Sequence, residues 1–348
     1  MQAPDTIIIG AGIIGSAIAW RLAQAGATVT LLDAGPLGGE ASWAGAGMLA
    51  PGGEISGRTV WTDFALESLA LYPAFVRELE DESGVAIDYR QCGAVELAST
   101  EADWQELRAR RAVQAELGIR AEAVDGGFFY PDDALVDPRD VTRALRSACH
   151  PRGVRIREQT RALEVRVSED RVEVAGSAGV LPAAVAVLAA GAWSGAIPIV
   201  RGGERLQIPA SFPVRGHLLG YRLEPGSLGP ILRRGHTYVM QRSNGFTIAG
   251  TSSEQVGFNR QLDPQIVAGI RARAGELLPR LRLAPEPDAW LGFRPATEDF
   301  APRIGRLGDT RVWLAYGHYR NGILLAPATA ARVAGEIARF KPSNSGMD

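Results

Sequence analysis

Two arginines and one tyrosine lie where their side chains could bind a small anionic substrate. Arg294 follows Gly-Phe and precedes Pro, and Arg320 lies just before the last apolar stretch of the chain. A guanidinium in such a loop can hold a carboxylate through two parallel hydrogen bonds, although most loop arginines are surface residues or members of structural ion pairs. Tyr238 could donate its hydroxyl to the same carboxylate or simply fill the core. The residues alone leave both readings open.

Three glycines near the start of the chain predict a phosphate-binding turn. Gly10, Gly12 and Gly15 form the pattern GxGxxG between the apolar strand predicted at Thr6–Ile9 and a helical periodicity that ends at Gly26. The first glycine permits the tight turn, the second lacks the Cβ that would block a pyrophosphate, and the third lets the helix approach the sheet. The helix N-terminus then presents free N–H groups to the phosphates.

Asp33 supports the same interpretation. It ends a second apolar strand, Thr28–Leu32, and a carboxylate at that point can accept hydrogen bonds from ribose hydroxyls. Strand, glycines, helix, strand and acid therefore occur in the order of a dinucleotide site, against the alternative of an ordinary βαβ turn with incidental glycines. The motif alone does not separate FAD from NAD.

Three further segments are predicted to approach this cofactor. The stretch Gly35–Pro51 is rich in small residues, which let a flat ligand come close. The buried run Val185–Ala190 ends at Gly191, and Gly317–Gly322 leads into a helix at Ile323–Phe340. If the N-terminus of that helix meets the cofactor, its partial positive charge would stabilise negative charge on a reduced flavin.

The order of strand types predicts the architecture. Strands typical of a parallel sheet occur at both ends of the chain and around Val185, and strands typical of an antiparallel sheet occur between them. We predict an α/β fold in which a Rossmann-like cofactor-binding domain (residues 1–85, 135–205 and 292–348) carries an inserted α+β substrate domain built on an antiparallel sheet (residues 86–134 and 206–291).

Composition excludes several classes of function. Among 348 residues, 37 Lys and Arg nearly balance 39 Asp and Glu, which does not favour nucleic-acid binding. The run Val180–Trp193 is too short to span a bilayer, and the four histidines lack the spacing of metal ligands. Cys92 and Cys149 form no CxxC pair, and the first strand begins too close to Met1 to leave room for a signal peptide, so we expect a cytoplasmic protein without a membrane span.

Six longer strings carry a family resemblance that runs essentially from end to end: IIIGAGIIGSAIAWRLA, GGEASWAGAGMLAP, LAAGAWSG, GHTYVMQR, LGFRPATEDFAPRIGR and GHYRNGILLAPATA. The chain resembles the D-amino-acid-oxidase-like flavoproteins and, among them, the glycine oxidases of thiamine biosynthesis. The last string and the Arg-Pro segment are the specific part, since many unrelated enzymes share GxGxxG.

The resemblance implies FAD, held without a covalent bond because the GHYRNG segment contains no cysteine. It places the pyrophosphate, the ribose, the adenine and the flavin ring along one set of residues. The implied cofactor contacts are Gly10, Gly12, Ile13, Ile14, Gly15, Asp33, Ala34, Ala41, Ser42, Ala46, Gly47, Met48, Ala162, Gly191, His318, Tyr319, Arg320, Asn321, Gly322, Ile323 and Leu324.

The resemblance also implies the reaction. Arg294 would hold the carboxylate of glycine or another small amino acid, with Tyr238 and Arg320 as further substrate contacts. Hydride would pass from Cα to flavin N5, and with molecular oxygen the products would be a 2-oxo acid (glyoxylate from glycine), ammonia and hydrogen peroxide. Ser253 stands where these oxidases carry a methionine, which predicts a wider or more polar pocket. The oligomeric state, a homo-oligomer included, stays open.

Three alternatives remain at this point. The first is a D-amino-acid or sarcosine-type dehydrogenase of the same fold that passes electrons to an acceptor other than oxygen. The second is an NAD-linked dehydrogenase, against which the Gly35–Pro51 stretch and the C-terminal helix argue. The third is an FAD-binding module without catalysis.

Overall fold

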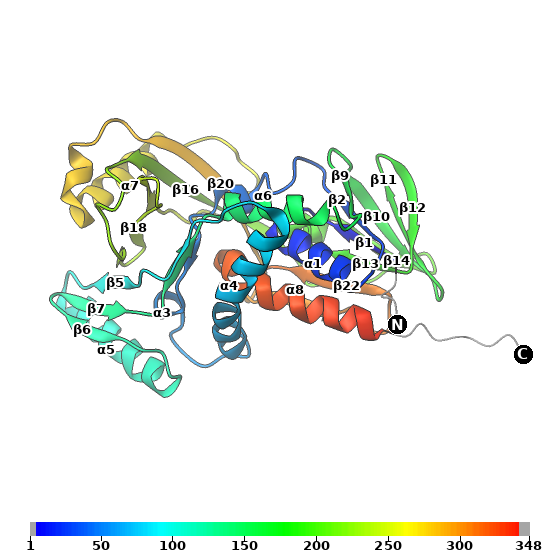
Figure 1. Cartoon of the computed structure of the whole chain (residues 1–348), viewed down its shortest axis with the longest axis horizontal. Coiled ribbons are helices and arrows are strands. Elements are labelled where there is room, and N and C mark those ends of the chain that lie inside the picture. The colour runs from blue at the N-terminus through cyan, green and yellow to red at the C-terminus, as the bar shows by residue number, and fades with distance from the viewer. Residues whose placement is uncertain (1–4, 341–348) are drawn as a thin grey trace, which may run out of the picture.

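A six-stranded sheet, parallel except at one edge, forms the core of one part of the computed structural model, which describes residues 5–340, and lies on the right in Figure 1. The edge strand β21 is antiparallel to its neighbour. In spatial order the strands are β21 (Arg303–Arg306), β22 (Val312–Tyr316), β13 (Val185–Leu188), β1 (Thr6–Ile9), β2 (Val29–Leu32) and β9 (Arg155–Arg157).

Both faces of this sheet are buried, because successive side chains of a strand point to opposite faces. Ile8 of β1 packs with a layer of helices, whereas Ile7 and Ile9 pack against a second, five-stranded sheet. The helices of the first layer are α1 (Ile13–Gln24), α4 (Thr62–Ser83), α6 (Pro138–Cys149) and α8 (Gly322–Arg339). The five-stranded sheet contains β12 (Gly179–Ala183), β11 (Val172–Gly176), β10 (Ala162–Val167), β14 (Ile199–Arg201) and β15 (Glu204–Arg205).

An eight-stranded sheet, antiparallel except for the pair β17 and β5, forms the other part of the molecule. Helix α7 (Pro264–Leu277) covers one of its faces. In spatial order its strands are β20 (Asp288–Ala296), β16 (Phe212–Arg222), β19 (Phe246–Gly250), β18 (Thr237–Gln241), β17 (Ile231–Arg234), β5 (Ala94–Leu97), β7 (Gly127–Tyr130) and β6 (Glu122–Val124).

The remaining elements belong to none of these three sheets. A three-stranded sheet contains β3 (Met48–Leu49), β8 (Ala134–Val136) and β4 (Tyr89–Arg90). The remaining elements are the helices α2 (Ala41–Ala44), α3 (Pro51–Glu54) and α5 (Glu101–Glu116) and the 3₁₀ helices η1 (Gly191–Ala196), η2 (Pro279–Arg282) and η3 (Tyr319–Asn321).

The predicted architecture, a Rossmann-like unit joined to a largely antiparallel sheet, is confirmed, while the residue boundaries of the two domains stay a prediction. Within residues 5–340, no helix is long and apolar enough to cross a membrane.

In the first turns of helix α8, side chains of α4 make hydrogen bonds to backbone groups of the helix. Pro327 lies inside α8 and has no N–H to donate to the carbonyl of Ile323, four residues earlier. The Tyr72 hydroxyl donates to that carbonyl instead, at 2.6 Å. Ser68 Oγ donates to the Leu324 carbonyl at 2.7 Å and accepts from the amide of Ala328 at 3.2 Å. Helix α4 therefore fixes the beginning of α8.

Replacing Tyr72 with Phe should destabilise the protein by about 1–3 kcal/mol, because the Ile323 carbonyl would then be buried without a donor. Urea unfolding of the variant measures this loss. Tyr89→Phe is the matched control, since the Tyr89 ring stacks on Tyr72 and its hydroxyl makes no hydrogen bond within residues 5–340. Equal stability of the two variants would contradict the role of the Tyr72 hydroxyl.

Candidate functional site

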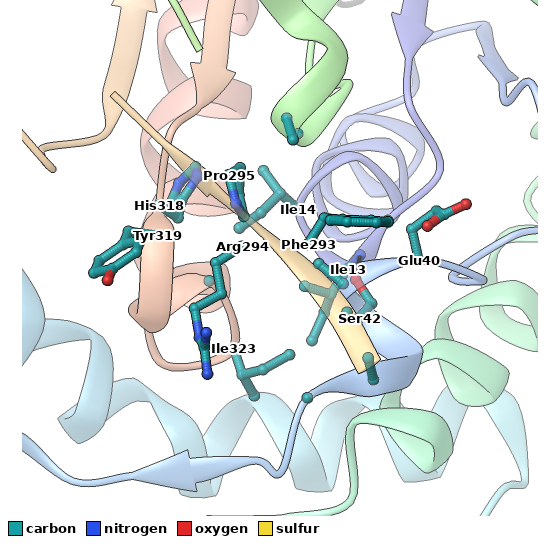
Figure 2. A pocket seen from close by; sticks show the side chains of 18 of the residues that line it. Ile13, Ile14, Glu40, Ser42, Phe293, Arg294, Pro295, His318, Tyr319 and Ile323 are labelled. Atoms are coloured by element: carbon teal, nitrogen blue, oxygen red, sulfur yellow. Dashed lines mark hydrogen bonds between the residues drawn. The ribbon is translucent and has the colours of Figure 1, made fainter. Parts of the chain in front are cut away.

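One elongated cavity of about 520 Å³ runs from the first βαβ unit to the eight-stranded sheet. Figure 2 shows side chains from distant parts of the chain converging on it: Ile13 and Ile14 from α1, Ser42 from α2, Arg294 from β20, and Tyr319 from the segment before α8. The beginning and the end of the chain therefore meet at one site.

The N-terminus of α1 forms one end of the cavity. Gly12 precedes the helix, and the first turn contains no acidic residue. Ser42 Oγ accepts a hydrogen bond from the Ile13 amide at 2.9 Å. A Cβ on Gly15 would lie 1.9 Å from the Gly10 carbonyl oxygen, so this close helix–strand packing requires glycine. The turn leaves a positive helix end facing the cavity, as the glycine pattern predicts.

The Asp33 carboxylate lies beside this turn, at the end of β2. It accepts hydrogen bonds from the Ala11 amide at 2.7 Å and from the Gly35 amide at 2.8 Å. Burial raises the pKa of Asp33 above its usual value, although these two amides act in the opposite direction. Each carboxylate oxygen has a second lone pair for a ligand hydroxyl.

The middle of the cavity is bounded by the segment that precedes β3. A Cβ on Gly47 would lie 2.0 Å from the Val136 carbonyl oxygen. Arg242, 3% exposed, donates from its guanidinium to the carbonyls of Val136 and Ala46. The buried guanidinium of Arg242, which follows β18, thus holds Ala46 of the Gly35–Pro51 stretch against β8 at the cavity wall.

Arg294 extends from β20 into the other end of the cavity and is partly buried there. Its Nη1 donates to the Ser252 carbonyl at 3.0 Å, and its Nη2 donates to Thr251 Oγ1 at 2.7 Å. Within residues 5–340 it forms no ion pair with a carboxylate. Burial lowers the pKa of Arg294, but an arginine keeps its charge at any physiological pH. The cavity therefore contains a cation that can bind an anionic ligand.

Tyr238 lies near Arg294 on the cavity wall and is 9% exposed. Burial, opposed by the charges of Arg294 and Arg320, raises the pKa of the Tyr238 phenol to about 12. The phenol is therefore a neutral hydrogen-bond donor at any working pH. Gly250 makes room for it, since a Cβ there would lie 2.5 Å from the hydroxyl oxygen.

Arg320 also lines the cavity, but its guanidinium already has a partner. Its Nη2 donates to Glu54 Oε1 at 2.7 Å, and the Arg320 side chain is 41% exposed. Glu54 ends α3, whose Gly52 amide donates to Asp133 at 3.2 Å and whose Gly52 carbonyl accepts from Gln114 at 2.8 Å. The α3 segment is thus anchored on both sides, and it supplies the carboxylate that pairs with Arg320.

His318 lies where the chain enters α8 and is 3% exposed. Its Nε2 is 3.2 Å from Thr329 Oγ1. Burial lowers the pKa of His318 to about 3, so the imidazole is neutral at physiological pH. Helix α8 has no acidic residue in its first turn, and the positive end of its dipole faces the cavity at Gly322.

Nearly all residues expected to contact the cofactor or substrate lie on this one cavity. They are Gly10, Gly12, Ile13, Ile14, Asp33, Ala34, Ala41, Ser42, Ala46, Gly47, Met48, Ala162, Gly191, Tyr238, Arg294, His318, Tyr319, Arg320, Asn321, Gly322 and Ile323. Gly15, Leu324 and Ser253 do not line it.

The three exceptions have physical reasons. Gly15 serves the packing of α1 on β1, as described above. Leu324 follows Ile323 on α8, and one helical step turns its side chain into the hydrophobic core, where it is 2% exposed. Thr251, and not Ser253, lies on the wall beside Arg294. Ser253 therefore has no direct contact with the cavity through which it would widen the pocket or make it more polar.

Sequence reasoning missed four residues at the site: Thr251, Gly216, Glu54 and Arg242. Arg242 ends the resemblance string GHTYVMQR, but no role was predicted for it, and the other three belong to none of the quoted strings. Each of the four acts on a residue far away in the chain. Glu54 lies three residues beyond the small-residue stretch.

Comparison with known proteins adds an independent line of evidence. The family model described as FAD dependent oxidoreductase (DAO) matches residues 5–336. Glycine oxidase of Bacillus licheniformis is 32% identical over 96% of this chain and 92% of the relative. The bifunctional protein ThiO/ThiG of Synechocystis is 36% identical over 97% of this chain and 52% of its own length. The crystal structure of glycine oxidase from Geobacillus kaustophilus superposes with a TM-score of 0.91 at 29% identity, covering 99% of this chain and 96% of that one.

The cavity has the shape and polarity that FAD requires. Gly12 leaves space at the N-terminus of α1, where the dipole suits a diphosphate. Asp33 offers carboxylate oxygens beside that turn. The small residues before β3 line the cavity and form a wall on which a flat ring can lie. Gly47 also lets this segment pack on β8, where a Cβ would meet the Val136 carbonyl oxygen.

Replacing Gly12 with Val should weaken FAD binding at least 10-fold, because the added methyl groups would occupy the space in front of the helix N-terminus. Titration of the flavin-free protein with FAD, followed by fluorescence quenching, measures the dissociation constant. Gly229→Val is the control, since a side chain at Gly229 meets open space. Unchanged FAD affinity of Gly12→Val would show that the diphosphate lies elsewhere.

Proposed function

Because the chain belongs to the FAD-dependent oxidoreductase (DAO) family, we propose that it oxidises glycine or another small amino acid. The products would be a 2-oxo acid, ammonia and, with oxygen as electron acceptor, hydrogen peroxide. The observation that carries the proposal is Arg294, a cation in the cavity whose guanidinium has no carboxylate partner within residues 5–340. The names of the relatives, glycine oxidases, favour the same class of substrate.

The site residues divide into two groups in this proposal. The N-terminus of α1 and Ser42 bind the diphosphate, Asp33 binds the ribose, and the residues before β3 together with Ile323 enclose the ring. When bound, FAD supplies the acceptor for the hydride that leaves Cα of the substrate.

Arg294 and Tyr238 bind and orient the substrate in the second group. The guanidinium holds the carboxylate, and the neutral phenol donates a further hydrogen bond to it. Two contacts on one carboxylate restrict the rotation of a ligand as small as glycine, so that Cα is presented to the ring in one orientation. Arg320 contributes its charge at the cavity wall while it stays paired with Glu54.

The test of this function is an anaerobic screen of the FAD-loaded protein with glycine, sarcosine and D-amino acids, followed by flavin absorbance. We expect bleaching with at least one of them and hydrogen peroxide when air is admitted. Bleaching without peroxide would assign a dehydrogenase that uses another acceptor, and no bleaching with any amine would overturn the proposal.

Arg294→Ala should raise the KM for the amino acid roughly 30-fold or more, because losing a charge-assisted contact at a buried site costs at least about 2 kcal/mol. FAD affinity should stay unchanged. Arg222→Ala, an exposed arginine at the end of β16, is the control. Normal kinetics in the Arg294 variant would remove it from substrate binding.

The pH dependence should follow the substrate, not the protein. The substrate amine must be neutral, since its lone pair stabilises the cation that forms as hydride leaves. The protein groups do not titrate in the working range, because the pKa of Tyr238 is raised to about 12 and the pKa of His318 is lowered to about 3. We expect kcat/KM to rise with pH through the amine pKa and its midpoint to shift when a substrate with a less basic amine is used. Tyr238→Phe should leave the midpoint in place. A midpoint that is the same for both substrates, or that moves in Tyr238→Phe, would indicate a titrating protein group instead.

A further inference from the structure

The side chain of Arg294 starts on β20 and extends across the neighbouring strand β16, so that its guanidinium lies beside the segment that follows β19. Arg294 is on β20 opposite Val214 of β16, and its two terminal nitrogens are bound by Thr251 and Ser252, which follow β19 on the other edge of β16. The crossing passes over Gly216, where a Cβ would lie only 2.2 Å from Nη1 and 2.5 Å from Nη2. A glycine in β16 therefore provides the space, and residues 251–252 provide the anchor.

The Thr251 hydroxyl is directed by its own donor bond. Its Oγ1 accepts from Arg294 Nη2 at 2.7 Å, and it donates to the His217 carbonyl of β16 at 3.1 Å, with the Ser252 carbonyl at 3.3 Å as a second acceptor. A hydroxyl has one proton, so donation to either carbonyl leaves a lone pair to face the guanidinium. Serine could make the same two bonds, but valine, which has nearly the same shape, could make neither.

The segment that carries this hydroxyl is itself fixed to β16. Ser252 Oγ accepts from the His217 amide at 2.9 Å and lies 3.0 Å from His217 Nδ1. Glu254 exchanges two backbone hydrogen bonds with Arg215, at 2.9 and 3.0 Å, and its carboxylate accepts from Arg215 Nε at 2.5 Å. Thr251, Ser252 and Glu254 are thus bound to two residues of β16, His217 and Arg215, and Thr251 has little freedom to follow a displaced guanidinium.

We propose that Thr251 is a positioning residue for substrate binding: its hydroxyl fixes the guanidinium of Arg294 in the orientation that receives the substrate carboxylate. This inference rests on the proposed function, since it takes the ligand of Arg294 to be a carboxylate. Nη1 donates to the Ser252 carbonyl and, at 3.5 Å, to the Arg215 carbonyl, and Nη2 donates to Thr251. The second Nη2 proton and the Nε proton are left for the cavity. Because the guanidinium is already ordered before the ligand binds, less conformational entropy is lost on binding.

The experiment compares Thr251→Val, Thr251→Ser and the unchanged protein, each loaded with FAD and titrated with acetate as the simplest carboxylate. Perturbation of the flavin absorbance reports binding without any turnover. We expect Thr251→Val to weaken acetate about 3- to 10-fold, the effect of releasing one ordered side chain, and Thr251→Ser to retain most of the affinity. FAD affinity should be the same in all three proteins, because Thr251 contacts the arginine and not the cofactor cradle.

Two controls separate positioning from a general loss of structure. Thr247→Val removes a buried hydroxyl from β19 that bonds to Gly245 and Gln241, away from Arg294, and it should leave the acetate affinity unchanged. In a double-mutant cycle, Thr251→Val should add no further loss to Arg294→Ala, because the hydroxyl acts only through the guanidinium.

The possible failures are distinguishable. If the unchanged protein and Arg294→Ala bind acetate equally, Arg294 is not a carboxylate site, and both the proposed function and this inference fall. If Arg294→Ala weakens acetate but Thr251→Val does not, or if Thr251→Val weakens it equally in the Arg294→Ala background, the positioning role alone is wrong.

Discussion

The site depends on keeping one cation, Arg294, at a cavity wall without an acidic partner. Removing a guanidinium from water is costly unless other groups replace its hydration. Here the carbonyls of Ser252 and Arg215 and the hydroxyl of Thr251 replace part of it, and none of them neutralises the charge. A carboxylate in their place would satisfy the cation fully and compete with any anionic ligand. The choice of neutral acceptors therefore preserves the attraction for a ligand while making burial tolerable.

This requirement constrains the eight-stranded sheet. Strands β20, β16 and β19 must be adjacent and in register, so that Val214 lies opposite Arg294 and Leu218 lies opposite Gly250. Glycine at position 216 is needed because any side chain there would occupy the path of the guanidinium. The opposite wall has its own constraint. Because Pro327 has no N–H for the Ile323 carbonyl, the Tyr72 hydroxyl donates to that carbonyl instead, and this bond fixes the end of α8 that faces the cavity.

The first βαβ unit was predictable because its information is local. The glycines, the apolar strands and Asp33 follow one another in the chain, and the backbone alone brings them together. The position of Arg294 in the site was predictable only through family resemblance. Thr251, Glu54 and Arg242 act across strand pairings or between the two parts of the molecule, and no spacing in the sequence encodes such contacts. Leu324 shows the opposite error, in which a motif assigns too many residues to a site. It is next to the cavity residue Ile323 in the chain, but its side chain lies in the core.

The ionisation of the cavity residues bears on how a small amine would be activated. Tyr238 is held protonated by burial, and His318 is held neutral by burial, so neither changes charge near neutral pH. On the α3 side, the carboxylate of Glu54 is paired with Arg320. An amino acid on Arg294 would therefore meet fixed donors and fixed charges. Such an environment favours a reaction in which the lone pair of the substrate nitrogen, and not a protein base, prepares Cα to release hydride, with the protein contributing alignment and electrostatics.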